Sequence, residues 1–453
     1  MVSVSRKIDF LQDRPAAVFA RLCLPLICVN LLQVFTTMLT NALYSLFVGE
    51  SIFTVIGYLA TATEAFYHLT HGVAVAAWVK TAHYHALYDQ QTAQQKTIQA
   101  LYSVFMVVAG TLILVLLFLD PILHAFNVPP SHYAMTRQYF AIWACSQSFI
   151  PFAQFLLMVV NGTSSPGQIL LSNFLSIAVM AVNAAVLLGV CRLGMVGAAM
   201  QPFFNAALQI LICLLLFRSK GFFRDFHPND FLPEWTILFS IIRYSLIITL
   251  QTMICVVGYL LTGLQTNKYL TADYISVLNV SIPVISVMNS IVQACSAFYP
   301  QNYGAGLTSR IRQFFILSNV CVFFYACLCC LIYIVFARPY YGRLFSDPVI
   351  VELGVKHWFW YAAGFIPLGF VYTVRFFFDS VGMGKISLLS GLGELIGHLI
   401  AAFVLIPNVG NMGRSLAHPL GWAIANVFLW GSFLLFRKRI YASCDAHRLS
   451  SAS

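Results

Sequence analysis

Twelve long apolar runs constrain this chain more than any other feature of its sequence. A transmembrane helix needs about 20 mostly apolar residues, and only 9% of the 453 residues are charged, against about 25% in soluble domains. The sequence therefore predicts an all-α polytopic membrane protein with twelve transmembrane helices, and it excludes a soluble enzyme or a nucleic-acid-binding protein. The expected spans are 17–48, 52–79, 98–119, 135–160, 168–190, 195–217, 236–263, 271–298, 313–337, 357–380, 386–406 and 417–436.

The distribution of basic residues orients these spans. With the N-terminus placed inside, the inner segments carry 16 Lys and Arg residues and the outer segments carry 7, as the positive-inside rule requires. We therefore expect a multi-pass protein of a bacterial inner membrane with both termini in the cytoplasm. The expected partners are a small-molecule substrate and the lipid bilayer, with the chain acting as a monomer that needs no cofactor or metal.

Weak internal similarity divides the chain into two halves. Leu32-Gln33 recurs as Leu250-Gln251, and Gly162-Thr163 recurs as Gly384-Lys385, at offsets of 218 and 222 residues. Six spans per half give two six-helix lobes related by a pseudo-two-fold axis along the membrane normal. The expected organisation is an N-terminal lobe (1–217), a cytoplasmic inter-lobe loop (218–235), a C-terminal lobe (236–437) and a cytoplasmic tail (438–453).

One motif after the eighth span is the most specific in the chain. Gln301-Asn302-Tyr303-Gly304-Ala305-Gly306 precedes Arg310-Ile311-Arg312, and the stretch resembles a turn of the multidrug and toxic compound extrusion (MATE) family. Further matches occur in the family's order along the chain, which resembles a divergent member. They are Leu24-Pro25, Asn41, Phe47-Val48-Gly49, Asn183, Gly194-Met195-Val196-Gly197-Ala198, Arg375, Gly382-Met383-Gly384, Glu394 and Pro419-Leu420-Gly421-Trp422.

The resemblance implies the MATE fold and export of organic compounds against an inflow of protons or sodium ions. The chain departs from the family where acids often couple the cation. Tyr44 stands where many members carry an Asp on the first helix, and Leu187 replaces an Asp on the fifth. His398 replaces an arginine on the eleventh. The family's carboxylate map therefore does not transfer to this chain.

Glu64, His68 and His71 are the candidates for ion coupling. They occupy one face of the second span at spacings of four and three residues. An ionisable group in a span is costly and marks a functional candidate, and a carboxylate bonded to an imidazole can pass a proton. The alternative is a polar seam satisfied against the next helix. Zinc binding is disfavoured because a structural site needs a fourth ligand.

The other charged positions inside spans are interpreted as structural. Glu394 and His398 are spaced i, i+4 on the eleventh span and are expected to form a polar clasp between helices. Arg375 and Asp379, with the same spacing on the tenth span, are expected to pair with each other. Candidates for lining a substrate cavity are polar residues inside spans, namely Gln33, Asn41, Tyr44, Asn183, Asn205 and Gln251.

The functional prediction is an ion-coupled secondary active transporter that works by alternating access. Aromatic residues make up 15% of the chain, which favours small amphiphilic or aromatic compounds as exported cargo. The alternative is a flippase for lipids or lipid-linked oligosaccharides, which would need a cationic cavity to hold phosphate. An enzyme is not expected, and no G-x-x-x-x-G-K-S/T loop for a built-in ATPase is present in the sequence.

Overall fold

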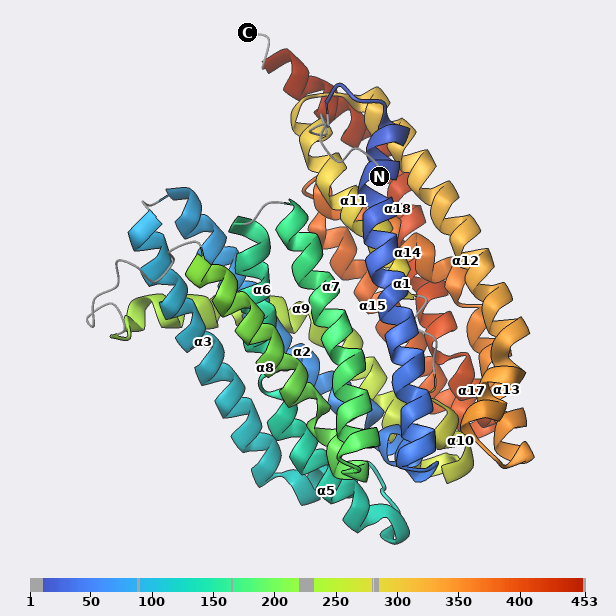
Figure 1. Ribbon diagram of the computed structural model, residues 1–453. Helices are drawn as coiled ribbons and strands as arrows, with labels where there is room; N and C mark the ends of the chain where they lie inside the picture. The colour runs from blue at the N-terminus through green and yellow to red at the C-terminus, as the bar shows by residue number, and fades with distance from the viewer. Residues whose placement is uncertain are drawn as a thin grey trace. The chain divides into compact units, whose positions relative to one another are not determined.

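The computed structural model (Figure 1) describes the chain except residues 1–10, 88–89, 164–165, 220–231, 279, 281–284 and 451–453. The described part is a succession of helices, and each of the twelve predicted spans coincides with one helix or with consecutive helices. The all-α fold is therefore confirmed. The elements are α1 (Pro15–Phe47), α2 (Ser51–Leu87), α3 (Gln90–Leu117), α4 (Leu119–Ala125), α5 (Pro130–Gln147), α6 (Ile150–Thr163), α7 (Pro166–Ala184), η1 (Ala185–Val190), α8 (Gly194–Ser219), α9 (Trp235–Tyr269), α10 (Ala272–Leu278), α11 (Ile285–Gly304), α12 (Thr308–Leu344), α13 (Pro348–Ala362), α14 (Phe365–Ser380), α15 (Gly384–Ile400), η3 (Ala401–Leu405), α16 (Ile406–Val409), α17 (Asn411–Ser415) and α18 (Ala417–Ser450).

Several predicted spans are interrupted rather than straight. Within the described residues, seven helices are long and apolar enough to cross a membrane by length and composition. The count is eight if α13 and α14, which meet at a 41° bend, together form one span. The fourth predicted span comprises α5 and α6, with two residues between them, and the eighth comprises α10 and α11, between which residues 279 and 281–284 lie outside the described part. Breaks inside a membrane are tolerated where protein or water satisfies the backbone.

The helices pack into two compact units. Unit 1 contains Met1–Phe35 and Ser281–Ser453, and unit 2 contains Thr36–Val280. The division falls inside α1, and α9 packs with unit 2, against α2. The lobe ranges expected from the sequence remain a prediction, and most of the expected inter-lobe loop lies outside the described residues. The expected tail is helical as far as Ser450, as a continuation of α18.

The core of unit 2 is built on small side chains of α2. Ala74 and Ala77 are fully buried among Val104, Phe155 and Cys213 of the surrounding helices. A methyl group at Gly263 of α9 would collide with the hydroxyl of Thr61 on α2, so the close approach of α9 to α2 requires glycine there. Close contact through small residues is the usual means of packing helices in lipid.

The core of unit 1 is aromatic instead. Phe298 stacks on Phe314 with ring centroids 3.9 Å apart, and the buried Trp358 lies 4.3 Å from Tyr333. Such pairs add roughly 0.5–1.5 kcal/mol beyond the area that they bury. These contacts join α11, α12 and α13 within the unit.

The ends of the fifth and eleventh spans share one backbone design. Each ends in a π-helical segment, η1 starting at Ala185 and η3 starting at Ala401. Each is followed by a glycine with positive φ, Gly194 (+54°) and Gly410 (+56°). Three residues further on, each has a second glycine, Gly197 and Gly413. The offset is 216 residues at each of these three positions, close to the offsets of 218 and 222 between the similar sequence pairs, so the similarity of the two halves includes the backbone.

The motif after the eighth span forms a tight turn between α11 and α12. Gly306 has φ +67°, a conformation that favours glycine. The buried Asn302 donates to the Phe298 carbonyl (3.0 Å) and accepts from Nε of Arg310 (2.8 Å). Arg310 also donates to the Asp13 carbonyl (2.5 Å). The motif thus fixes the turn and fastens the segment before α1 to it.

Candidate functional site

A carboxylate and an imidazole meet on α2 of unit 2. Oε1 of Glu64 lies 3.0 Å from Nε2 of His68, one helical turn away. The Glu64 side chain is 49% exposed, that is, about half of it is not covered by other residues, although it lies near the middle of the helix. A charged group at this depth has to face a partner or water rather than lipid. The structure thus brings two of the three predicted coupling residues together.

His71 lies on the same face of α2 but contacts a different set of residues. Its Nδ1 lies 2.7 Å from Oε1 of Gln154 on α6, and its ring stacks on Tyr67 at a centroid distance of 5.1 Å. Gln154 in turn donates weakly to the Tyr67 hydroxyl (3.5 Å). This branch fits the polar-seam interpretation, because the imidazole is satisfied by a neighbouring helix. Tyr67 and Gln154 were not predicted as site residues.

A second polar centre of unit 2 contains only neutral side chains. Tyr44 donates its hydroxyl to Oε1 of Gln201 (3.0 Å). Nδ2 of Asn183 donates to Oδ1 of Asn205 (2.7 Å) and, more weakly, to the Gln201 carbonyl (3.2 Å). The Gln201 side chain is buried, and its Nε2 has no hydrogen-bond partner within the described part of the chain. The centre therefore has a spare donor that faces no protein acceptor.

The remaining cavity candidates are distributed differently. Asn41 is buried on α1 in unit 2, and Gln33 lies on the part of α1 that belongs to unit 1. Gln251 lies on α9, but its side chain is outside the described residues. The structure therefore gathers Tyr44, Asn183 and Asn205 into one cluster, and Gln201 is the member that the prediction omitted.

Unit 2 also has an apolar crevice of about 680 Å³ between α3, α6 and α8. Its walls include Tyr102 and Phe105 of α3, Phe152 and Phe155 of α6, and Phe217 of α8. Its size is within the range of ligand pockets, which are mostly apolar and aromatic. Sequence periodicity could not find it, because which of the 39 phenylalanines face one another depends on packing.

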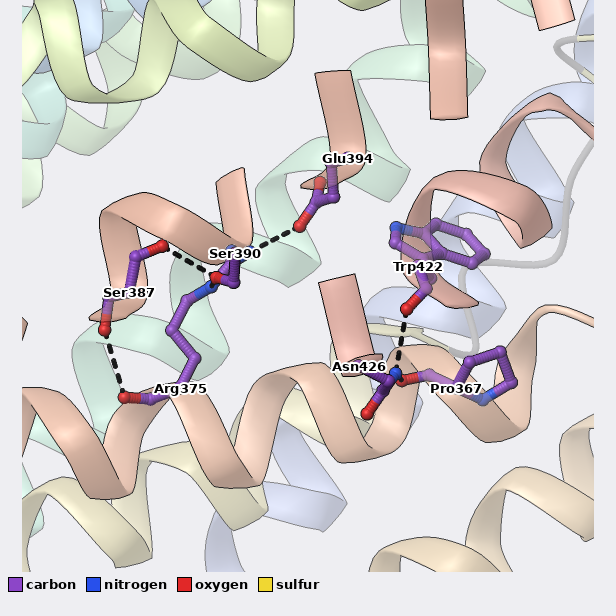
Figure 2. Close-up of polar contacts among 7 residues, drawn as sticks. All are labelled: Pro367, Arg375, Ser387, Ser390, Glu394, Trp422 and Asn426. Carbon is purple, nitrogen blue, oxygen red and sulfur yellow. Dashed lines mark hydrogen bonds and ion pairs between the residues drawn. The ribbon is translucent and has the colours of Figure 1, made fainter. Parts of the chain in front are cut away.

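Unit 1 contains a buried ion pair between α14 and α15. Figure 2 shows Arg375 reaching from α14 to residues of α15. Nη2 of Arg375 lies 2.5 Å from Oε1 of Glu394, and its Nε donates to Oγ of Ser390 (2.9 Å). The Glu394 side chain is only 5% exposed. A charge this deeply buried needs such a partner.

Arg375 and Asp379 both contact α15, and their expected pairing with each other remains a prediction. Arg375 forms its ion pair with Glu394 of the next span, while Asp379 accepts a hydrogen bond from Ser387 of α15 (2.5 Å). Spacing along one helix could not reveal this, because a long guanidinium reaches across to the neighbouring helix. Asn426 adds a further tie, donating from α18 to the Pro367 carbonyl of α14 (2.6 Å; Figure 2).

Three imidazoles, two of them buried, lie near a buried arginine in unit 1. His398 of α15 lies against His418 of α18 with ring centroids 4.8 Å apart, and Nδ1 of His357 lies 2.9 Å from Oγ of Ser415. Arg414, adjacent to Ser415, is buried as well. His398 thus contacts another histidine, in addition to any role in the predicted clasp. Within the described residues, no three His, Cys, Asp or Glu side chains are placed to hold a metal ion.

Among the polar residues that the sequence did not predict, only the histidines had a recognisable sequence feature. His357 and His418 stand at the ends of apolar runs, where each ionisable group deserves inspection. Only the fold reveals that they join His398, because they come from three different helices. Ser387 and Ser390 gave no such signal, since serine is common in transmembrane helices.

Comparison with known proteins finds one family model and several solved structures that are similar to this chain. Residues 25–187 match the MatE family model. A MATE-family multidrug resistance transporter of the MOP superfamily in an inward-facing conformation superposes with a TM-score of 0.77 at 16% identity, covering 92% of this chain and 98% of that one. An outward-facing structure of such a transporter gives 0.71 at 17%, covering 97% and 99%.

A MOP superfamily transporter from Pyrococcus furiosus Vc1, described as having a binding pocket of reverse polarity, gives a TM-score of 0.66 at 16% identity, covering 97% and 99%. No curated protein matches the chain significantly. At these identities the structural matches establish the fold of nearly the whole chain.

The fold and its long apolar helices define an integral, multi-pass membrane protein. Residues 25–187 resemble the MatE family model, and nearly the whole chain has the fold of the MATE structures.

Proposed function

We propose that the protein is a proton-coupled secondary transporter that exports small amphiphilic or aromatic compounds by alternating access. The observation that carries the coupling is the pair between Glu64 and His68, 3.0 Å apart near the middle of α2. A hydrogen-bonded carboxylate and imidazole can accept a proton and pass it on. Sodium remains the competing ion, and the experiment below separates the two.

The first-helix position supports this assignment. Tyr44, where many family members carry an acid, donates a hydrogen bond to a neutral amide. The centre formed by Tyr44, Gln201, Asn183 and Asn205 has no carboxylate that could bind and release a cation. It suits hydrogen bonding to cargo, because Gln201 retains a spare buried donor. Glu64 therefore takes over the coupling role in this proposal.

The aromatic crevice of unit 2 supports the proposed cargo class. Its lining is almost wholly apolar, and the rings of Tyr102, Phe152 and Phe155 offer stacking surfaces. Aromatic faces also attract organic cations. We propose export from a bacterial cytoplasm across the inner membrane, with both termini inside, from the distribution of Lys and Arg.

The test is uptake in proteoliposomes of a panel of dyes containing ethidium, a planar aromatic cation, and a neutral aromatic dye. A pH gradient without sodium and a sodium gradient at constant pH are applied separately. We expect the wild-type protein to respond to the pH gradient and E64Q to lose that response. The matched control is E234Q, because Glu234 is also 49% exposed and also pairs with a cation, Lys96, at 2.9 Å.

Each outcome of this assay decides something. Undiminished pH-driven uptake in E64Q rejects the assigned coupling residue, and a response to sodium alone rejects the proton. Transport of no dye in the panel rejects export of aromatic compounds. Movement of a fluorescent phospholipid in the same vesicles would favour the flippase alternative, for which the partly buried Arg375 offers little because Glu394 already neutralises it.

A further inference from the structure

A groove of about 620 Å³ lies between the start of α12 and the end of α18 in unit 1. It is outside every polar centre described above. The lining residues are Arg312, Phe315, Ile316, Phe433, Arg437, Lys438, Tyr441, Ala442 and Asp445. Three of these carry a positive charge and one a negative charge, so the groove is basic.

The two halves of the groove differ in chemistry along the helix axes. Arg312 immediately precedes the ninth predicted span, and Arg437 immediately follows the twelfth. One turn further into these spans, Phe315 and Phe433 stack with ring centroids 4.7 Å apart. Beside them Ile316 is 64% exposed. The groove thus has charged residues at the expected membrane boundary and apolar ones at the depth of acyl chains.

One of the basic side chains is held in place over an aromatic ring. The guanidinium of Arg312 lies over Tyr441, 4.2 Å from the ring centroid. This cation–π contact orients the guanidinium and leaves its charge unneutralised. The acidic member, Asp445, accepts a hydrogen bond from Thr308 (2.6 Å), at the first residue of α12.

We propose that this groove binds an anionic glycerophospholipid. Its phosphate would lie between Arg312, Arg437 and Lys438, and an acyl chain would cover Phe315, Ile316 and Phe433. Basic pockets between transmembrane helices at the cytoplasmic side recognise lipid headgroups through this combination. Charge complementarity distinguishes the occupant from a zwitterionic lipid, and the apolar half distinguishes it from a free anion. The proposal does not depend on which compound is transported.

The experiment is native mass spectrometry and thermal unfolding of the purified full-length protein in detergent. Phosphatidylglycerol, phosphatidylcholine and inorganic phosphate are added separately. We expect phosphatidylglycerol to remain bound and to raise the melting temperature, because a ligand of the folded state stabilises it. In R312Q/R437Q its apparent affinity should fall roughly 30-fold, the loss expected for two basic groups at an anionic headgroup.

Two further proteins keep the test decisive. The control R343Q/K356Q removes the same number of charges from exposed positions at the other end of unit 1, on α12 and α13, and should bind like wild type. R312K/R437K preserves the charges and should retain most of the affinity. Equal binding of both lipids, equal stabilisation by inorganic phosphate, or undiminished affinity in R312Q/R437Q would each overturn the proposal.

Discussion

The junction between the fifth and sixth spans in unit 2 has a backbone similar to that of the junction between the eleventh and twelfth spans in unit 1. The polar side chains at the two junctions differ. Both have a π-helical segment, a glycine with positive φ and a second glycine three residues later. Unit 2 places Asn183 and Gln201 on this scaffold, whereas unit 1 places His398 and His418 within one residue of the corresponding positions.

This difference separates what the fold provides from what the side chains provide. The repeated backbone fixes where polar groups can be buried between two helices. In unit 2 those groups are amides and a phenol that keep the same charge throughout the physiological pH range. In unit 1 they include imidazoles, a buried arginine and an ion pair. The unit 1 region should therefore depend on electrostatics, and the unit 2 region on hydrogen bonds alone.

The largest effect is expected from breaking the ion pair of unit 1. E394Q leaves the Arg375 guanidinium without its carboxylate and should lower the free energy of unfolding by about 3 kcal/mol. This is at the low end for buried pairs because the Arg375 side chain is 25% exposed. Unfolding in mixed micelles measures the change. The double variant R375Q/E394Q should recover part of the loss, and equal losses in both variants would reject a coupled pair.

The second glycine of each scaffold offers a direct comparison between the two regions. A methyl group at Gly413 would lie 2.5 Å from the backbone carbon of Leu405, whereas at Gly197 the nearest atom is Cβ of Leu193 at 2.8 Å. Since backbone yields less than a side chain, G413A should cost about 2 kcal/mol and G197A about 1 kcal/mol. Melting temperatures of the two purified variants test the order, and a larger loss in G197A would contradict it.

A smaller effect is expected in the neutral centre of unit 2. Q201L removes the acceptor of the Tyr44 hydroxyl (3.0 Å) and should cost about 1 kcal/mol, the net value of a neutral hydrogen bond. Adding Y44F should restore stability, because no hydroxyl then lacks its partner. A cost as large as that of E394Q would show that the two regions do not differ in the way proposed here.

Much of this architecture could be predicted from apolar runs alone, because each span must bury its backbone hydrogen bonds within the membrane. The spacing of Glu64 and His68 predicted their contact, since residues four apart on a helix are neighbours. Partners on other helices could not be predicted this way: Glu394 for Arg375, Gln201 for Tyr44 and His418 for His398. The spacing within one helix does not determine which neighbouring helix a long side chain reaches.

The smallest effect on stability is expected from an exposed ion pair in unit 2, which contrasts with the buried ion pair of unit 1. On α4, between the third and fourth predicted spans, Asp120 accepts hydrogen bonds from Nε of Arg137 (2.7 Å) and from Tyr133 (2.8 Å). The hydrogen bond from Arg137, followed by that from Tyr133, lowers the pKa of Asp120 below its ordinary value of 3.8. Exposed pairs of this kind contribute little because water screens them.

A lowered pKa fixes the direction of the pH dependence. The pair stabilises the fold at every pH above the ordinary value of 3.8, and this contribution is lost as the pH falls through the lower value of the folded state. The difference in melting temperature between wild type and D120N should therefore be small at pH 7 and vanish at pH values well below 3.8.

At about 1 M salt, where charges are screened beyond roughly 3 Å, this difference in melting temperature should shrink at pH 7 too. The effect of E394Q should survive the same salt because the Glu394 carboxylate is buried. Equal salt sensitivity of the two variants would mean that burial does not distinguish the two pairs.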